Sequence, residues 1–371
     1  MRRNLFGVAL SLAALGGVGY LGFALTRVRE FNRRGRVQAR ALPAVSVLKP
    51  LYGEEEGLFE NLRSFCEQNY PVFEVILGVH DVHDPALETA QRIVARYPDR
   101  ARLAIGDGTA GAANPKVANL TGMIGIARHG MIVMADADMR VSGAYLRRLV
   151  APFEAGDVGA VTCLYAGSPN ARVASQLGAM FINEQFAPSV LVATALEPLR
   201  YCFGATIAVR RSVLEGIGGF AALRDHVADD HLLGKLVTDR GLRVVLSDYV
   251  VENVIDEPDF ESLWARELRW SRTIRSVRPL GHAFSFLTFG LPLAALATLV
   301  TRGRYGTPLL LALAAGLRVA LHLEAKAGSV ALIPLRDALS FAVWAASFVA
   351  RDVDWRGQRL ELDAAGEILE S

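Results

Sequence analysis

Between residues 45 and 135, short apolar segments alternate with segments of helical periodicity, and this alternation restricts the fold more than any other feature of the chain. Strands are predicted at 45–48, 74–79, 102–105 and 131–135, and helices at 54–68, 85–97 and 116–127. Strands that alternate with helices build a mainly parallel sheet covered by helices. The first strand is not followed by G-x-G-x-x-G, so the fingerprint of a dinucleotide-binding domain is missing. The expected class is α/β.

Two carboxylates follow the last of these strands. Asp136 and Asp138 come directly after the apolar run 131–135, with the small Ala137 between them. Open α/β sheets bind ligands beyond the carboxyl ends of their strands, and carboxylate oxygens suit Mg²⁺ or Mn²⁺. The sequence thus predicts a divalent metal site at Asp136 and Asp138. A solvated, aspartate-rich turn is the alternative.

The N-terminal segment is apolar enough to cross a membrane. Residues Leu5 to Thr26 carry no charge, and a helix of this length spans the ~30 Å hydrocarbon core. An arginine cluster follows within residues 27–40, which predicts a retained anchor and places the next domain on the cytoplasmic side. A signal peptide is the alternative, although its apolar region would be shorter. The mean hydropathy of +0.28 also indicates membrane segments.

Further apolar segments lie at 283–300, 309–323 and 329–350. The second contains Arg318 and the third contains Arg336 and Asp337, and charges inside a span are costly unless they pair or reach an interface. A soluble helical bundle is the alternative, but little polar surface exists here to cover one. The predicted division is a transmembrane anchor at 1–27, a basic linker at 28–42, an α/β domain at 43–257, an amphipathic interfacial helix at 258–280, C-terminal membrane helices at 281–350 and a polar tail at 351–371.

Charge and cysteine spacing argue against two kinds of site. The net charge is +2 and no long basic run is interleaved with aromatic residues, so no nucleic-acid partner is expected. Cys66, Cys163 and Cys202 are far apart and form no Cys-x-x-Cys pair. We therefore expect reduced thiols rather than a disulfide framework or a zinc site.

Two further groups of polar residues lie where a strand ends or a helix begins. Asp81 and Asp84 follow the strand at 74–79 and are candidate acceptors for a base or a ribose hydroxyl; Asp84 could also cap the next helix. Asn114-Pro115-Lys116 precedes a helix whose first N–H groups, with the Lys116 ammonium, favour an anion such as phosphate. An ordinary asparagine cap with an exposed lysine is the alternative.

The second half is predicted to contain strands at 158–164 and 204–210 and helices at 173–184 and 227–239. Asp229 and Asp230 lie near the start of the last helix, where acids suit the helix dipole. One of them could instead be a general base for an acceptor hydroxyl. Arg266, Arg269 and Trp270 lie on a basic amphipathic helix of the kind that lies on an anionic membrane surface, and its arginines could also clamp a diphosphate.

The motifs follow one another along the chain in this order: Lys49-Pro50, Asp81/Asp84, Asn114-Pro115-Lys116, Asp136, Asp230 and Arg266-x-x-Arg269-Trp270. Together they resemble the ceramide glucosyltransferase family, whose members are membrane-bound relatives of the family-2 glycosyltransferases with a GT-A fold. The resemblance covers roughly residues 43–280, and the ordered set of motifs is far more specific than any one of them. Through Cys202-Phe-Gly-Ala-Thr206 and residues 267–275, the chain looks closest to the bacterial hopanoid-biosynthesis glycosyltransferases.

The resemblance implies a role for each motif. Asp81 and Asp84 would contact the uridine, and Lys116 would help hold the diphosphate. Asp136 matches the second signature aspartate of the family, and Asp138 completes a D-x-D that the animal ceramide enzymes do not show in full. Asp230 would be the general base. Arg266, Arg269 and Trp270 would bind the leaving diphosphate and the acceptor side.

The expected function is that of an inverting, UDP-sugar-dependent glycosyltransferase acting on a hydroxyl of a membrane lipid. A hopanoid acceptor with UDP-N-acetylglucosamine is preferred, and a ceramide acceptor with UDP-glucose is the alternative. A non-catalytic nucleotide-sugar-binding membrane protein should lack an acid at the base position, where this chain has Asp229 and Asp230. A polymerising synthase would need more spans than the roughly four candidates. The expected partners are the UDP-sugar, the lipid acceptor and the bilayer, and the expected location is the inner membrane, multi-pass, with the catalytic domain cytoplasmic.

Overall fold

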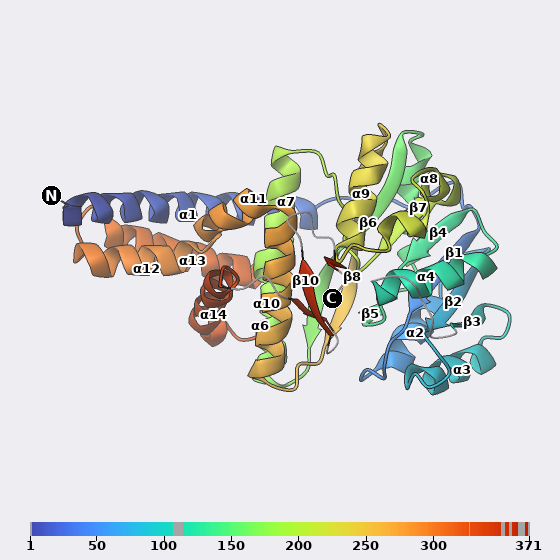
Figure 1. Ribbon diagram of the computed structural model, residues 1–371. Helices are drawn as coiled ribbons and strands as arrows, with labels where there is room; N and C mark the ends of the chain where they lie inside the picture. The colour runs from blue at the N-terminus through green and yellow to red at the C-terminus, as the bar shows by residue number, and fades with distance from the viewer. Residues whose placement is uncertain are drawn as a thin grey trace.

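The computed structural model describes residues 2–106, 114–325, 327–349, 353–355, 358–362 and 368–369. An eight-stranded sheet with helices packed on it forms one part of the molecule, and long apolar helices project from it on one side (Figure 1). The strand order is β3-β2-β1-β4-β7-β6-β8-β5. The strands are β1 (Val45–Pro50), β2 (Phe73–Val79), β3 (Ala101–Ile105), β4 (Met131–Met134), β5 (Met139–Arg140), β6 (Val158–Pro169), β7 (Ile207–Arg210) and β8 (Arg243–Ile255).

The sheet is mixed but mostly parallel. Strands β3, β2, β1 and β4 run parallel, and the register aligns Leu48 with Ile76 and Met134. Strand β7 is antiparallel to β4 and β6, β6 is parallel to β8, and β5 is antiparallel to β8. Because β1, β2 and β4 end at the same edge, the polar residues that follow them gather along that edge.

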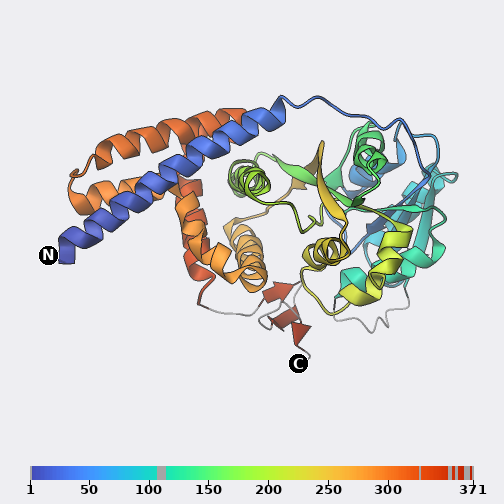
Figure 2. The ribbon, with the colours of Figure 1, turned by 90° about the horizontal axis from the view of Figure 1, so that it is seen from above.

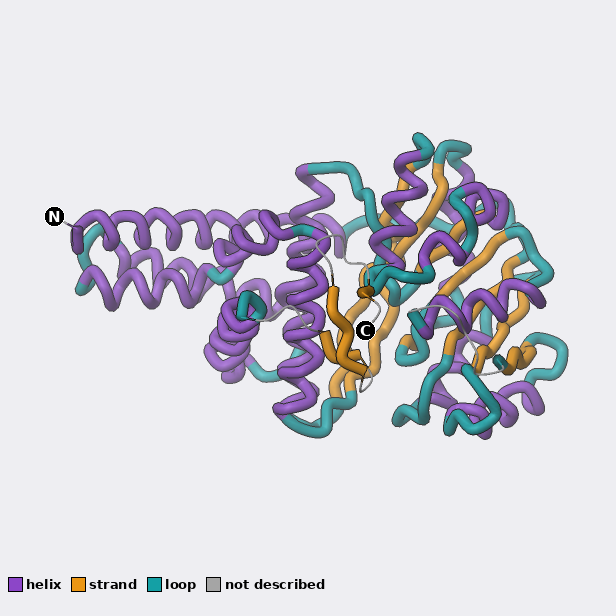
Figure 3. The backbone as a smooth tube through the Cα atoms, in the orientation of Figure 1, coloured by secondary structure: helices purple, strands orange, loops and turns teal. Residues whose placement is uncertain are grey.

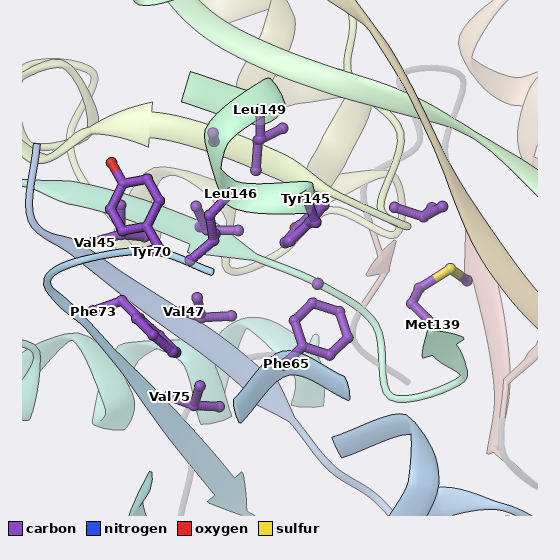
Figure 4. Packing of buried hydrophobic residues seen from close by; sticks show 14 of the residues in the cluster. Val45, Val47, Phe65, Tyr70, Phe73, Val75, Met139, Tyr145, Leu146 and Leu149 are labelled. Atoms are coloured by element: carbon purple, nitrogen blue, oxygen red, sulfur yellow. The ribbon is translucent and has the colours of Figure 1, made fainter. Parts of the chain in front are cut away.

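Helices pack on both faces of this sheet (Figure 3). Helices α2 (Leu58–Cys66), α3 (Ala86–Arg96) and α5 (Tyr145–Val150) cover one face, and α4 (Pro115–Ile126), α8 (Arg211–Gly216) and α9 (Asp229–Asp239) cover the other. Successive strand residues point to opposite faces. Val47 therefore packs with Phe65 and Tyr145 (Figure 4), whereas Leu48 packs with Leu120 and Leu233 on the other face.

The predicted strands and helices of the first half are present within a few residues of their expected bounds. The second half differs more. The thirteen-residue strand β8 was not predicted, because charged and polar residues such as Asp248 and Asn253 interrupt its apolar pattern. The helix predicted at 173–184 is α6 (Val173–Phe181), and it continues through a π-helical turn at Ile182–Phe186 into α7 (Ala187–Leu196).

The remaining helices lie beside the sheet or extend away from it on one side (Figure 2). They are α1 (Arg2–Asn32), α10 (Phe260–Val277), α11 (Pro279–Phe284), α12 (Gly290–Thr301), α13 (Thr307–Ala325) and α14 (Ile333–Ala346). The tail forms three short antiparallel strands, β9 (Val353–Trp355), β10 (Gln358–Leu362) and β11 (Ile368–Leu369), and β9 lies beside α10.

Three helical segments in the described part of the chain are long and apolar enough to cross a membrane: Leu5–Asn32, Val173–Leu196 and Thr307–Ala325. The segments Pro279–Thr288 and Gly290–Thr301 pass the same test together, but they are bent by 66°. Helix α14 has 14 residues and would reach only about 21 Å. It is therefore too short to cross the hydrocarbon core alone.

Charges within the apolar segments pair with one another. Arg318 of α13 donates to Glu184 at 2.6 Å and to Asp337 at 3.0 Å. Arg336 of α14 makes two hydrogen bonds of 2.7 Å to Glu267 of α10, and both side chains are fully buried. The π-helical turn positions Glu184, so these pairs join α13 and α14 to the helices beside the sheet.

Candidate active site

Asp136 and Asp138 lie in the turn that follows β4, and two other strands hold this turn. The ammonium of Lys49, buried in β1, donates to the backbone carbonyl of Asp136 and lies 3.9 Å from the ring centroid of Phe65. From β8, Nδ2 of Asn253 donates to Oδ2 of Asp138 at 2.7 Å. The carboxylates predicted from the end of a strand are thus fixed at the carboxyl edge of the sheet.

Lys116 extends from the first turn of α4 to the same place. The side chain of Asn114 caps this helix, with Oδ1 accepting the N–H of Lys116 at 3.0 Å. The ammonium nitrogen of Lys116 lies 2.7 Å from Oδ1 of Asp136 and 3.9 Å from Oδ2 of Asp229. The asparagine cap, which was the alternative expected from the sequence, is therefore present, and the Lys116 side chain also reaches the acidic site.

Asp229 and Asp230 begin α9 and, with Asp136 and Asp138, form an acidic cluster in which Asp136, Asp229 and Asp230 attract Lys116. Both oxygens of Asp230 accept backbone N–H groups, Oδ2 from Gly204 at 2.8 Å and Oδ1 from His231 at 2.7 Å. Asp229 is buried, whereas Asp230 is partly exposed. Of the two neighbours, Asp230 is therefore the one that a ligand can reach more easily.

Burial sets the electrostatics of this cluster. It raises the pKa values of Asp138 and Asp230, and it raises that of Asp229 to about 6 even though Lys116 opposes the shift. Burial also lowers the pKa of Lys49 to about 7, against the attraction of Asp138. Burial alone would lower the pKa of Lys116, but the neighbouring carboxylates raise it above the usual value. The Lys116 side chain therefore stays positively charged beside these carboxylates.

Asp81 and Asp84 lie after β2, at the same edge of the sheet. Asp84 is buried, and its Oδ1 accepts the N–H groups of Gly53 and Ala86, both at 2.9 Å. Oδ1 of Asp81 accepts the N–H of His83 at 2.6 Å. Asp84 thus ties the loop after β1 to the start of α3, which is the capping role considered beside nucleotide binding.

Arg266 and Trp270 of α10 pack against each other on the other side of the site. The guanidinium of Arg266 pairs with Glu257 at 2.6 Å and lies 5.1 Å from the ring centroid of Trp270. Trp270 stacks on Phe181 of α6 with centroids 5.9 Å apart. Arg266 is among the cations that oppose the raised pKa of Asp138, so its charge acts on the acidic cluster. Arg269 lies on the same helix and is partly exposed.

Nearly the whole chain matches one known protein family. The sequence profile of glycosyl transferase family 21 matches residues 9–368. The chain belongs to this family. The expectation of a glycosyltransferase family related to the ceramide glucosyltransferases is thus confirmed at this level.

The curated relatives of this family 21 chain include ceramide glucosyltransferases. Ceramide glucosyltransferase 1 of Caenorhabditis elegans is 25% identical over 210 residues, which are 56% of this chain and 45% of that protein. Ceramide glucosyltransferase 3 of the same organism is 23% identical over 234 residues, which are 62% of this chain and 50% of that protein. The chain spans about half the length of the curated relatives it matches.

A solved structure supports the fold assignment. The mannosyltransferase PcManGT from Pyrobaculum calidifontis, in complex with GDP-Man and Mn²⁺, matches with a TM-score of 0.56 and 22% identity. The match covers 94% of this chain and 98% of that protein. The predicted α/β class with a GT-A-like sheet and appended apolar helices is therefore confirmed.

The donor chemistry of the acidic cluster fits a divalent cation. Asp136 and Asp138 supply hard oxygen atoms, and a magnesium-type ion needs only one or two carboxylates when water and phosphate complete its shell. Within the described ranges, no three His, Cys, Asp or Glu side chains are grouped as a protein-only metal site. The ammonium of Lys116 already lies against Asp136, which indicates that this position accepts a cation.

Several residues that position the aspartates of this site were not predicted from the sequence. Lys49 and the Cys202–Thr206 run contributed only to the family resemblance, although Lys49 holds Asp136 and Gly204 holds Asp230. Asn253 was missed because its strand was missed. The signal that could have found β8 is its content of β-branched residues, five valines and one isoleucine among thirteen residues.

Proposed function

We propose that this family 21 chain is an inverting glycosyltransferase that moves a sugar from a UDP-sugar to a hydroxyl of a membrane lipid. The observation that carries this proposal is the continuity between the acidic cluster and the apolar helices. Phe203 is the neighbour of Gly204, whose backbone N–H binds Asp230. The Phe203 ring belongs to the same hydrophobic cluster as Leu21 of α1 and Leu293 of α12. A lipid could therefore bring its hydroxyl to Asp230 from the membrane side.

Each polar group would handle one part of the donor. Asp81 and Asp84 would contact the uridine, and Lys116 would pair with the diphosphate oxygens. Arg266, Arg269 and Trp270 would hold the leaving diphosphate and border the acceptor. A Mg²⁺ or Mn²⁺ ion held by Asp136 and Asp138 would supply Lewis-acid stabilisation of the charge on the departing UDP.

Asp230 would be the general base. Its carboxylate would take the proton from the lipid hydroxyl while the hydroxyl oxygen attacks the anomeric carbon, and the bond from that carbon to the UDP oxygen would break on the opposite face. Gly204 and His231 would fix the carboxylate in place. Burial raises the pKa of Asp230, which strengthens it as a base.

The acceptor that we propose is a hopanoid, with UDP-N-acetylglucosamine as the donor. The similarity of Cys202–Thr206 and residues 267–275 to hopanoid-biosynthesis enzymes supports this choice. Ceramide with UDP-glucose is the second candidate, and the names of the Caenorhabditis elegans relatives favour it. The mannosyltransferase of the shared fold binds a nucleotide sugar and Mn²⁺, which supports a nucleotide-sugar donor and a divalent ion in either case.

The test is transfer of label into lipid. Membranes that contain the full chain would be incubated with labelled UDP-N-acetylglucosamine or UDP-glucose, together with purified hopanoid or ceramide acceptors. Labelled hopanoid is expected with the first donor, and membranes that carry Asp230→Asn serve as the control. Labelled ceramide would select the second candidate. Binding of donor without any labelled lipid would instead support a non-catalytic binding protein.

A further inference from the structure

The position of Lys116 within the acidic cluster has a consequence for how the donor binds. Its ammonium lies 2.7 Å from Asp136 and 3.9 Å from Asp229. Gly204 leaves room for this convergence, because a Cβ there would lie 3.2 Å from both the ammonium of Lys116 and Oδ2 of Asp136, and 3.5 Å from Oδ2 of Asp230. Acids from the turn after β4 and from the start of α9 thus surround one ammonium from α4.

The backbone of Asp136 and the carboxylate of Asp230 are held in place, whereas the cation lies at the end of a flexible side chain. Lys49 holds the backbone of Asp136, and backbone N–H groups hold both oxygens of Asp230. The Asn114 cap holds the backbone N–H of Lys116, and the ion pair with Asp136 holds its ammonium at the end of a four-carbon chain that can rotate. A change of cation at this site therefore requires movement of one flexible side chain, while the backbone of Asp136 and the carboxylate of Asp230 keep their hydrogen bonds.

We propose that the Lys116 ammonium and the divalent ion are alternative occupants of one cation position at Asp136. Two cations beside the same carboxylate repel each other strongly in a partly buried site. The ion can therefore bind only when Lys116 gains another anion, and the diphosphate of the donor provides it. The metal then enters together with the nucleotide, and the free protein binds the metal poorly. This inference rests on the proposed metal-assisted use of a UDP-sugar.

The test compares Mn²⁺ binding to the full-length protein in detergent, without sugar transfer. Free Mn²⁺ is followed by electron paramagnetic resonance during titration, with and without UDP, and corrected for Mn²⁺ that free UDP binds. Lys116→Met should bind Mn²⁺ alone about tenfold or more tightly than the unmodified protein. Lys235→Met is the matched control, because Lys235 is exposed on α9 and pairs with Asp239, away from the cluster.

Two further measurements separate exchange from a general change in charge. UDP should tighten Mn²⁺ binding much more in the unmodified protein than in Lys116→Met, because only the former must relocate a lysine. Adding Asp136→Asn to Lys116→Met should remove the gain in affinity. Equal Mn²⁺ affinity in Lys116→Met and the unmodified protein would overturn the inference while leaving the proposed function intact. Absence of Mn²⁺ binding to any variant, even with UDP, would overturn both this inference and the metal in the proposed function.

Discussion

At the residue scale, Asp229 and Asp230 are adjacent acids in different environments. Asp230 is the more exposed, and two backbone N–H groups orient it. Asp229 is buried and lies 3.9 Å from the Lys116 ammonium. We predict that Asp230→Asn, which keeps size and polarity but removes basicity, lowers kcat by about 10²–10⁴-fold at saturating donor.

The neighbouring acid provides the control for this prediction. Asp229→Asn should reduce kcat much less, and UDP binding should survive in the Asp230→Asn protein. Titration of UDP into both variants, beside kcat, distinguishes loss of the base from loss of the nucleotide site. A larger fall in kcat for Asp229→Asn would assign the base to Asp229 instead.

The raised pKa values predict the shape of the pH profile. Burial raises the pKa of Asp230, and that of the adjacent Asp229 to about 6, against an ordinary aspartate value of ~3.9. A protonated carboxyl cannot take the acceptor's proton, so kcat should decline toward acid at a higher pH than an ordinary aspartate would cause, by about tenfold for each pH unit at the limit. Measuring kcat from pH 4 to 8 with saturating donor tests this. A rate that stays level until the pH approaches the ordinary aspartate value of ~3.9 would contradict it.

Much of the site could be predicted from local sequence because its residues follow strands or begin helices. Asp136 and Asp138 end a buried run, Asn114 and Lys116 begin a helix, and parallel strands bring such ends to one edge. Their partners could not be predicted in this way. Lys49, Gly204 and Asn253 meet the acids only through the strand order, which places β1 and β7 next to β4, and β8 next to β5.

At the element scale, the pair of Arg336 and Glu267 fixes α14 to α10. Both side chains are fully buried and share two hydrogen bonds of 2.7 Å, and Arg336 also donates to the carbonyl of Leu177 at 3.0 Å. Arg336→Met would leave the Glu267 charge buried without its partner. We predict a loss of about 3–5 kcal/mol in stability, seen as a lower thermal unfolding midpoint of the detergent-solubilised protein.

Two comparisons test whether the buried charge is the cause. Combining Arg336→Met with Glu267→Leu should recover much of the loss, because no charge then stays buried alone. Arg243→Met breaks an exposed pair with Asp157 of 2.6 Å, which water screens, and should lower the unfolding midpoint far less. If Arg336→Met unfolded at the same temperature as Arg243→Met, the pair would not hold α14 in place.

Sequence patterns predicted elements well where apolar periodicity was clean, as in β1, β2 and α3. They failed where tertiary contacts decide the outcome. Strand β8 tolerates Asp248 and Asn253 because Arg148 and Asp138 bind them. The continuation of α6 into α7 was missed because the π-helical turn carries Glu184, whose carboxylate pairs with Arg318 and lies 2.8 Å from Nδ1 of His322, both on α13. These partners lie far along the chain from the residues they bind, so local sequence does not reveal the pairs.

At the scale of the whole molecule, contacts along α1 set the direction of the helices that pack on it. Gly7 lies beside Thr301 at the end of α12, and Arg29 pairs with Glu324 at the end of α13, at 2.7 Å. Helix α12 therefore runs antiparallel to α1, and α13 runs parallel to it. At Gly17 a Cβ would lie 2.7 Å from Cα of Gly290, so paired glycines let α1 and α12 approach closely.

This arrangement makes a prediction about topology. If α1 crosses the inner membrane, the turn between α12 and α13 lies on the side opposite the sheet. We propose that the sheet, within the domain at 43–257, faces the cytoplasm, where UDP-sugars are made. The arginine cluster after Thr26 supports this orientation, because cytoplasmic flanks are enriched in Lys and Arg.

Single cysteines can report both sides at once, because the native thiols Cys66, Cys163 and Cys202 are all buried. Ala95→Cys on α3 and Arg304→Cys in the turn between α12 and α13 are both at exposed positions. In intact cells an impermeant maleimide should label Arg304→Cys from outside, whereas Ala95→Cys should react only after permeabilisation. Labelling of Ala95→Cys in intact cells would reverse the orientation of the sheet. Protection of both cysteines would mean that α1 and the α12–α13 pair do not cross the membrane, since the helix directions place the two sites at opposite ends of α1.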